Sequence, residues 1–315
     1  MMTISIIIPV NNEEDSIPEL YNRVSKALNN LTNQWEVLCI NDGSDDKSLT
    51  LLVDLHKKEK KWKVIDLSRN FGHQRAIWAG LEYATGDFIG IMDADLQDAP
   101  ELFETFLHNF QKDTDVVYAI RKNRKENVLK KISYWFFYRL LKYIFSINMP
   151  LDSGDFCLMR KKVVTQILKM PEQSLFFRGI RSWVGFNQKG ITYERDERQA
   201  GKSKYSLKRL FKLAYNGLYS FSNFPIKFLG RLGLFIIISS LLYSIWIITK
   251  KLVWGQVPEG FTTLILVMLF FGGIQLVTVR ILGEYIYRIY EETRKRPLYI
   301  IRDMYGDIGT VKKEN

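Results

Sequence analysis

Three short polar segments stand where apolar runs of the chain end. They are residues 11–13 (Asn-Asn-Glu), residues 41–46 (Asn-Asp-Gly-Ser-Asp-Asp) and residues 93–98 (Asp-Ala-Asp-Leu-Gln-Asp). The carboxylates of Asp93 and Asp95 would repel each other unless a divalent cation lay between them. A hard cation such as Mg²⁺ or Mn²⁺, held by one or two carboxylates, completes its coordination with substrate phosphates. These segments therefore predict a metal-bound nucleotide diphosphate site.

The elements that must position these segments alternate in type over residues 1–120. Continuous apolar runs separated by helix-like segments predict an α/β fold with a mostly parallel sheet and helices on both faces. In such sheets ligands bind beyond the carboxyl ends of the strands, where the polar segments lie. Ser44 and Asp98 are expected to cap two of the helices. Strands are expected at residues 4–10, 37–40, 64–67, 88–92 and 116–119, and helices at residues 16–31, 44–58, 74–84 and 100–110.

Charge is distributed unevenly along the chain. The 315 residues carry a net charge of +11 and are 47% hydrophobic, which excludes a disordered tail. Residues 1–100 hold 10 basic and 16 acidic side chains, whereas residues 201–250 hold 8 basic and no acidic ones. An acidic head and a basic region indicate an anionic partner, either a membrane or a nucleic acid. Cys39 and Cys157 lie in apolar runs and are expected to be buried thiols, and the three histidines leave any metal to be held mainly by carboxylates.

Two uncharged runs near the C-terminus, residues 232–249 and 261–279, are long enough to cross a membrane. At about 1.5 Å per residue, each nearly spans the ~30 Å core of a bilayer. We expect two transmembrane helices, at about 232–249 and 261–282, within a membrane region of residues 229–282; buried core helices are the alternative. Basic residues flank the outer ends, so both termini are expected in the cytoplasm. The N-terminal residues lack the pattern of a signal peptide, which also favours a cytosolic head.

Other segments are expected to lie at the membrane surface. Residues 205–228 contain apolar residues at three- and four-residue spacing with basic residues between them, which predicts amphipathic helices in the membrane interface. Residues 130–147 combine aromatic and basic residues in a predicted helix that either lies in the interface or packs on the soluble core. Residues 283–315 are expected to form a cytosolic C-terminal tail.

The motifs taken together resemble a known family. Residues 9–13, 41–46 and 93–98, with Pro100-Glu101 and with Ser153-Gly154-Asp155-Phe156, occur in the order and spacing of inverting family 2 glycosyltransferases of the GT-A fold. With the basic segment Lys202-Ser203-Lys204-Tyr205 and the two spans, the chain is more narrowly similar to polyprenyl-phosphate glycosyltransferases, such as bactoprenol glucosyltransferases and dolichol-phosphate mannose synthase. The resemblance implies a GT-A catalytic domain over residues 1–204 and a homotetramer at the bacterial inner membrane.

This resemblance also assigns roles to residues of the polar segments. Asp155 and Asp95 are the implied catalytic residues; Asp155 is either a base or acceptor-orienting carboxylate, or a structural residue in a turn. Asn11 stands where the family usually has Tyr, and Asn41 where it usually has Asp. Arg75 either touches the donor phosphates or is solvated. The resemblance implies donor-nucleotide binding by Pro9, Asn11, Glu13, Asp42, Asp93, Ala94 and Gln97, and metal binding by Asp93, Asp95 and Gln97.

A polyprenyl phosphate acceptor would account for the basic excess. Such a lipid presents its phosphate at the membrane surface, where Arg and Lys side chains bind it. Because a phosphate is already anionic near neutral pH, transfer needs positioning more than a strong base. The candidate acceptor ligands, each of which is alternatively a solvated surface cation, are Arg121, Arg124, Lys131, Lys202 and Lys204.

The expected reaction is inverting transfer of a single sugar from a nucleotide sugar, UDP-glucose in the first place, to undecaprenyl phosphate at the cytosolic membrane face. Single transfer is expected because the sequence lacks the Gln-x-x-Arg-Trp motif of processive synthases. Other donors remain open: UDP-N-acetylhexosamine, UDP-aminoarabinose or GDP-mannose. A membrane-anchored nucleotide-sugar-binding protein without turnover is a further alternative. A nucleic-acid-binding protein would explain the positive charge but not the two apolar spans. A channel or transporter would explain the spans but not the N-terminal region with its acidic segments.

Overall fold

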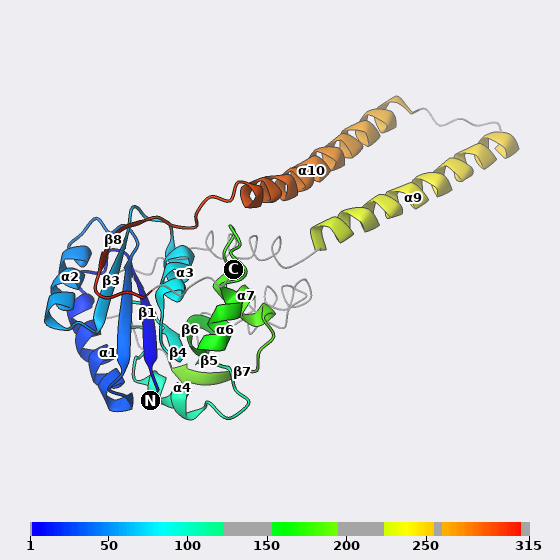
Figure 1. The fold of residues 1–315 in the computed structure, drawn as a ribbon. Helices are drawn as coiled ribbons and strands as arrows, with labels where there is room; N and C mark the ends of the chain where they lie inside the picture. The colour runs from blue at the N-terminus through cyan, green and yellow to red at the C-terminus, as the bar shows by residue number, and fades with distance from the viewer. Residues whose placement is uncertain (1, 123–152, 195–223, 255–259, 310–315) are drawn as a thin grey trace. The chain divides into compact units, whose positions relative to one another are not determined.

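The computed structural model describes residues 2–122, 153–194, 224–254 and 260–309 (Figure 1). Its central element is an eight-stranded sheet in the order β7-β5-β6-β4-β1-β2-β3-β8. The strands are β1 (Ile4–Val10), β2 (Trp35–Asn41), β3 (Trp62–Leu67), β4 (Phe88–Ile91), β5 (Val116–Lys122), β6 (Ser153–Arg160), β7 (Gln188–Glu194) and β8 (Ile301–Tyr305). The helices are α1 (Ile17–Leu31), α2 (Ser48–Lys58), α3 (His73–Tyr83), α4 (Leu102–His108), α6 (Lys161–Ile167), α7 (Phe177–Trp183), α9 (Phe224–Trp254) and α10 (Phe261–Thr293).

The sheet is mixed, with six strands running in one direction and two, β6 and β8, running against them. Strand β1 pairs in parallel with β2 and β4, and β2 pairs in parallel with β3, as expected for strands that alternate with helices. Strand β7 pairs in parallel with β5, and both run in the same direction as β4, because β6 is antiparallel to β4 and to β5. Strand β8 is antiparallel to β3. The expected mostly parallel arrangement therefore holds for six of the eight strands, and the two exceptions, β6 and β8, lie beyond residues 1–120, on which the expectation rested.

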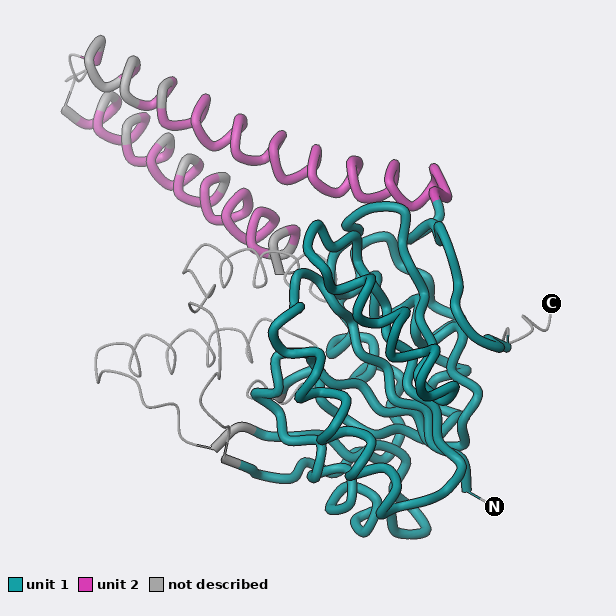
Figure 2. The backbone as a smooth tube through the Cα atoms, turned by 90° about the vertical axis from the view of Figure 1, so that its left-hand side faces the viewer, with its two compact units in different colours: residues 1–142, 147–209, 297–315 teal, residues 143–146, 210–296 magenta. Residues whose placement is uncertain are grey.

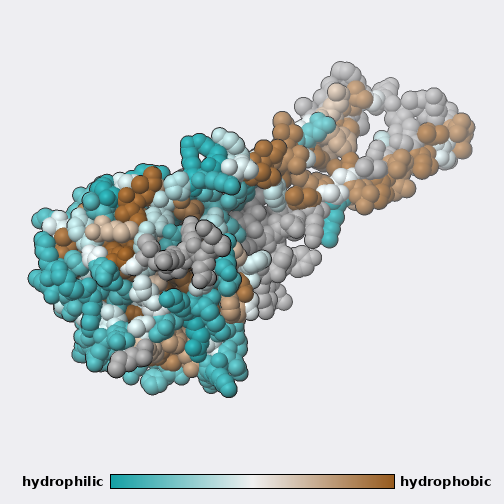
Figure 3. Space-filling model, viewed as in Figure 1, coloured by the Kyte–Doolittle hydropathy of each residue, from teal (hydrophilic) through white to brown (hydrophobic). Residues whose placement is uncertain are grey.

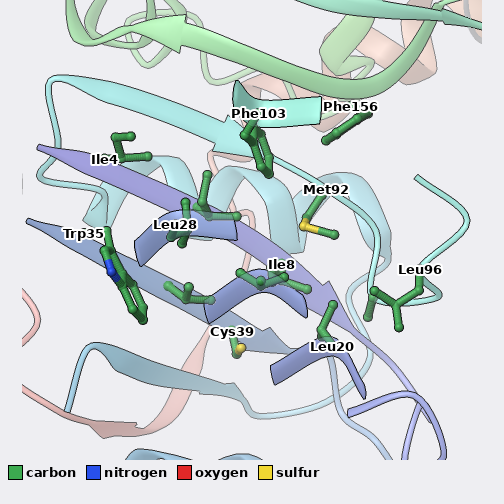
Figure 4. Close-up of a cluster of buried hydrophobic side chains, with 14 of the residues drawn as sticks. Ile4, Ile8, Leu20, Leu28, Trp35, Cys39, Met92, Leu96, Phe103 and Phe156 are labelled. Carbon is green, nitrogen blue, oxygen red and sulfur yellow. The ribbon is translucent and has the colours of Figure 1, made fainter. Parts of the chain in front are cut away.

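Helices pack on both faces of the sheet. The buried side chains of α1 recur at three- and four-residue spacing, so that one side of this helix faces the sheet. Figure 4 shows Leu20 and Leu28 of α1 in the same apolar cluster as Ile8 of β1. Neighbouring residues of a strand point to opposite faces. On the other face, α3 approaches β1 so closely that a Cβ atom at Gly80 would lie 2.2 Å from Ile7 Cγ2.

The two long helices form a compact unit of their own. One unit comprises residues 1–142, 147–209 and 297–315, and the other comprises residues 143–146 and 210–296 (Figure 2). Within the second unit α9 and α10 run side by side, and hydrophobic side chains gather along both helices (Figure 3). Among the described residues, one segment, Phe228–Lys250 of α9, is long and apolar enough to cross a membrane by length and composition. The second span, at residues 261–282, stays a prediction.

The C-terminal residues contain a strand that the sequence did not predict. Instead of a tail over residues 283–315, the chain continues α10 to Thr293 and then adds β8 to the edge of the sheet. Leu298, just before β8, is buried, and the hydroxyl of Tyr299 donates a hydrogen bond to Glu82 of α3. The charged residues that follow the second apolar run hide this short apolar segment in the sequence. The C-terminal strand therefore belongs to the head.

Candidate active site

Neighbouring strands bring the predicted polar segments to one edge of the sheet. Strands β4, β1 and β2 are adjacent and parallel, so the segments that follow them, residues 93–98, 11–13 and 41–46, emerge at the same edge. Strand β6 runs in the opposite direction beside β4, so its first residues reach this edge as well. The site is therefore built from the ends of three strands and the start of a fourth.

Asp93 and Asp155 face each other across β4 and β6. The ladder between β4 and β6 ends at the pair Ile91 and Cys157, and Asp93 and Asp155 each lie two residues beyond that pair, at the same end of the ladder. His73, the first residue of α3, lies between them, with its Nε2 3.5 Å from Asp93 Oδ1 and 3.5 Å from Asp155 Oδ2. Burial disfavours the charged imidazole, but the hydrogen bond to Asp155 and the charge of Asp93 outweigh it and raise the pKa of His73 to about 9. An imidazolium flanked by two carboxylates results.

Asp155 is held in place by side chains from two helices. Arg178 Nε of α7 donates to Asp155 Oδ1 at 3.0 Å, and Gln74 Nε2 of α3 donates to Asp155 Oδ2 at 3.1 Å. The Oε1 of Gln74 accepts a hydrogen bond from the Phe177 backbone N–H at 2.7 Å, which joins α3 to α7. Burial alone would raise the pKa of the Asp155 carboxyl, but the charge of Arg178 and the contact with His73 hold it well below its usual range. Asp155 is therefore an oriented, ionised carboxylate.

Asp93 has the surroundings of a metal ligand. Its Oδ1 is buried and accepts no hydrogen bond from the described residues, and burial raises the pKa of its carboxyl. Asp95 lies in the same loop, where its Oδ1 accepts a hydrogen bond from the Gln97 backbone N–H at 3.2 Å. In the part of the chain that the structure describes, no three His, Cys, Asp or Glu side chains form a group that could hold a metal ion. Two carboxylates from one loop, those of Asp93 and Asp95, are the donor set of a cation that takes its remaining ligands from a bound phosphate.

Hydrogen bonds join the loop after β1 to the loop after β2. Asn11 Nδ2 donates to the backbone carbonyl of Asp42 at 2.9 Å. Asn12 adopts a left-handed φ of 56°, which Asn tolerates, and its Oδ1 accepts a hydrogen bond from the Asp45 backbone N–H at 2.8 Å. The backbone N–H of Asn12 donates to Ser44 Oγ at 3.1 Å. The two loops that the sequence assigned to the donor are thus one hydrogen-bonded unit.

Asp42 and Gly43 attach this unit to the segment that leads into α3. The buried carboxylate of Asp42 accepts hydrogen bonds from the backbone N–H groups of Phe71, at 2.6 Å, and Gly72, at 2.9 Å. Burial outweighs these hydrogen bonds and raises the pKa of the Asp42 carboxyl. Gly43 has a φ of 61°, and a Cβ atom there would lie 2.4 Å from the backbone N of Asn70. Only glycine fits this close approach of two loops.

The predicted donor, metal and catalytic residues all lie at this edge of the sheet. They belong to β1, to β6 or to the segments that directly follow β1, β2 and β4: Pro9, Asn11, Glu13, Asp42, Asp93, Ala94, Asp95, Gln97 and Asp155.

Of the predicted acceptor ligands, Arg121 lies in β5, opposite Tyr193 of β7. The predicted helix at residues 130–147 and residues 205–223 of the predicted amphipathic region lie outside the described residues, as do Arg124, Lys131, Lys202 and Lys204. Their roles stay predictions.

Sequence reasoning missed His73, Gln74 and Arg178. The segment of residues 70–75 stood out only for Arg75, whose Nη2 donates to the backbone carbonyl of Gln173 at 3.4 Å. A signal for His73 and Gln74 was present, because they open the helix that follows β3 and so lie beyond a strand end, as the acidic segments do. Arg178 carried no such signal, since only the fold brings α7 to β6.

The two helix caps predicted from the sequence are wrong. The Oγ of Ser44 donates to Asn41 Oδ1 at 2.6 Å, and α2 begins later, at Ser48. Asp98 is buried and accepts a hydrogen bond from the hydroxyl of Tyr193. Both residues tie loops together instead of ending helices.

Comparison with known proteins agrees with the resemblance that the motifs indicated. A family model described as glycosyl transferase family 2 matches residues 5–168. An uncharacterized glycosyltransferase YkcC of Bacillus subtilis (strain 168) is 42% identical over 303 residues, which cover 96% of this chain and 94% of that protein. A bactoprenol glucosyl transferase of Shigella phage SfV is 39% identical over 303 residues, covering 96% and 99%. The solved mannosyltransferase PcManGT from Pyrobaculum calidifontis, in complex with GDP-Man and Mn²⁺, is 13% identical with a TM-score of 0.49, covering 69% of each chain. The chain belongs to glycosyl transferase family 2.

Proposed function

We propose that this glycosyltransferase moves one sugar from a nucleotide sugar, UDP-glucose in the first place, to a polyprenyl phosphate at the cytosolic face of the membrane, with inversion at the anomeric carbon. The observation that carries the proposal is the placement of Asp93 and Asp155 on either side of His73, beside the loops after β1 and β2. Full-length similarity to a bactoprenol glucosyl transferase supports the lipid acceptor and the glucosyl donor.

The donor occupies the edge formed by the ends of β1, β2 and β4. In this proposal its nucleoside lies against the loops containing Pro9, Asn11, Glu13 and Asp42, and its diphosphate lies at Asp93, Ala94, Asp95 and Gln97. Asp93 and Asp95, with Gln97 beside them, hold Mg²⁺ or Mn²⁺ together with the diphosphate oxygens. The buried Oδ1 of Asp93, which lies 3.5 Å from His73 Nε2 and accepts no hydrogen bond from the described residues, supports this role. When bound, the cation stabilises the charge that develops on the leaving nucleoside diphosphate.

The acceptor phosphate approaches from the side of Asp155. Its oxygen is anionic near neutral pH, so the chain's main task is to hold that oxygen in line with the anomeric carbon. Asp155 orients the acceptor indirectly: its ionised carboxylate is bound by Arg178 and Gln74 and fixes these side chains at the site, without contacting the anionic phosphate itself. Basic side chains bind the acceptor phosphate itself. The proposed ligands are Arg121, Arg124, Lys131, Lys202 and Lys204.

We propose that the two long helices attach the chain to the membrane. Phe228–Lys250 of α9 has the length and composition of a span, and we propose that α10 supplies a second one, so that the head and both termini face the cytoplasm at the inner membrane. The basic residues before α9 would then lie at the lipid surface, where the acceptor phosphate is presented.

A donor panel tests the proposal. The full chain in nanodiscs that contain undecaprenyl phosphate is incubated with Mg²⁺ or Mn²⁺ and, separately, with radiolabelled UDP-glucose, UDP-N-acetylhexosamine, UDP-aminoarabinose and GDP-mannose. We expect label in the lipid fraction with UDP-glucose and its loss in Asp95→Asn. Asp54→Asn, which removes an exposed carboxylate on α2, is the matched control and keeps full activity. If no donor labels the lipid while UDP still binds, the chain is a nucleotide-sugar-binding protein and the proposal fails.

A further inference from the structure

The C-terminal strand carries an arginine toward the site. The pairing of β8 with β3 shifts its register between Asp66 and Leu67, and Arg302 is left out of the ladder at that point. Such a bulge re-aims the side chain of the extra residue. Arg302 Nη1 lies 3.5 Å from Asp66 Oδ2, and Nη2 donates to the backbone carbonyl of Ser68 at 2.6 Å. The bulge therefore directs Arg302 to the end of β3.

Asp66 connects Arg302 to the loop after β2. The Asp66 side chain is 1% exposed, and its Oδ1 accepts a hydrogen bond from Asn41 Nδ2 at 2.7 Å. Asn41 Oδ1 in turn accepts a hydrogen bond from Ser44 Oγ at 2.6 Å, and Ser44 Oγ accepts one from the backbone N–H of Asn12. One ion pair and three hydrogen bonds thus lead from β8 to both loops at the proposed nucleoside site.

An amide at position 41 is what this arrangement requires. An aspartate in the same place would set two carboxylates 2.7 Å apart, and two carboxylates that close resist being ionised together. With Asn41 as donor, one oxygen of Asp66 faces an amide and the other faces a guanidinium. Asn41 and Asp66 are therefore matched in hydrogen bonding, and Asp66 and Arg302 are matched in charge.

We propose that Arg302 is a positioning residue for nucleotide binding: through Asp66 it fixes Asn41 and, with it, the loop of residues 41–46. This inference rests on the proposed function, in which that loop binds the donor nucleoside. It makes the strand after the second long helix part of the donor site. Arg302 contacts Asp66 and the backbone carbonyl of Ser68, at the end of β3 and not at the proposed metal ligands, so its loss is expected to change donor affinity more than turnover at saturating donor.

Nucleotide binding by the full chain tests the inference. UDP is titrated with Mn²⁺ into the protein in nanodiscs, and Kd is measured by calorimetry. Arg302→Gln is expected to raise the Kd for UDP about 3- to 10-fold, and Arg302→Lys, which keeps the charge, is expected to raise it less. Tyr299→Phe removes a contact of the same segment with α3 instead of with the donor loop, so it should leave Kd within about twofold.

Exchanging the amide and the carboxylate of Asn41 and Asp66 separates an effect on the position of the loop from a simple loss of stability. Asn41→Asp is expected to weaken UDP binding at least about tenfold, because two carboxylates then face each other. Adding Asp66→Asn restores one amide and one carboxylate, and should return Kd to within about threefold of wild type. Wild-type affinity in Arg302→Gln or Asn41→Asp, or a double variant no better than Asn41→Asp, overturns the inference. If the wild-type chain itself does not bind UDP, the proposed function fails first.

Discussion

Removing Arg178 should destabilise the head through its effect on Asp155. The Arg178 Nε–Asp155 Oδ1 distance is 3.0 Å, and the two side chains are 24% and 9% exposed. At an effective dielectric constant of about 20, opposite charges 3.0 Å apart attract by about 5 kcal/mol. Water screens part of this at Arg178, and Asp155 keeps its contacts with Gln74 and His73. We therefore expect Arg178→Ala to cost about 2–3 kcal/mol.

Thermal unfolding, followed by tryptophan fluorescence, measures this cost. For a domain of this size, about 2–3 kcal/mol corresponds to a Tm lower by roughly 5–10 °C. In an Asp155→Asn background the same Arg178→Ala change should cost about 1 kcal/mol or less, since no charge is left unpaired. Lys162→Ala is the control, because Lys162 pairs with Asp115 at 2.6 Å but is 59% exposed, and we expect a cost below about 1 kcal/mol. If Arg178→Ala lowered Tm equally in the wild type and in Asp155→Asn, the proposed effect on Asp155 would be refuted.

Three further predictions concern a loop, a buried carboxylate and the metal. Gly43→Ala would force a Cβ atom to 2.4 Å from the Asn70 backbone, so it should cost about 2 kcal/mol or more and weaken UDP binding in calorimetry; an unchanged Kd would contradict the loop packing. Burial alone would raise the pKa of Glu36, but hydrogen bonds from Lys63, Ser5 and Thr85 lower it, so the stability that ionised Glu36 adds is present above about pH 4.5 and disappears as the pH falls through the lowered value. The difference in Tm between wild type and Glu36→Gln should therefore be largest near neutral pH and shrink toward about pH 3. A difference in Tm that does not change with pH would contradict a role for ionised Glu36 in stability. Treatment with EDTA should abolish transfer, Mn²⁺ or Mg²⁺ should restore it, and full activity in EDTA would exclude the proposed metal role.

The first four strands and the donor loops could be predicted from the sequence because their signals are local. Apolar runs, turn residues and helical periodicity lie close together in residues 1–110, and the parallel order of β4, β1 and β2 brings residues 11–13, 41–46 and 93–98 to one edge. The carboxylates proposed for the metal follow directly from that rule. In this region local pattern and tertiary fold agree.

The remaining part of the site depends on long-range contacts. Asp155 meets Asp93 because β6 pairs antiparallel with β4, and Arg178 reaches Asp155 from a helix later in the chain. The C-terminal strand was missed for a related reason: a five-residue strand at the edge of a sheet has little periodicity of its own, and its place is decided by the exposed edge of β3. His73 was within reach of sequence reasoning, since it opens the helix that follows a predicted strand.

The identity and stereochemistry of the product test the central claim most directly. The full chain is incubated with UDP-glucose, undecaprenyl phosphate and Mn²⁺, and the extracted lipid is analysed by mass spectrometry and NMR. We predict undecaprenyl phosphate that carries one hexose, joined through phosphate with the β configuration that inversion of an α-linked donor requires. A lipid with several sugars, an α-linked product, or glucose released to water without any lipid product would contradict the proposed reaction.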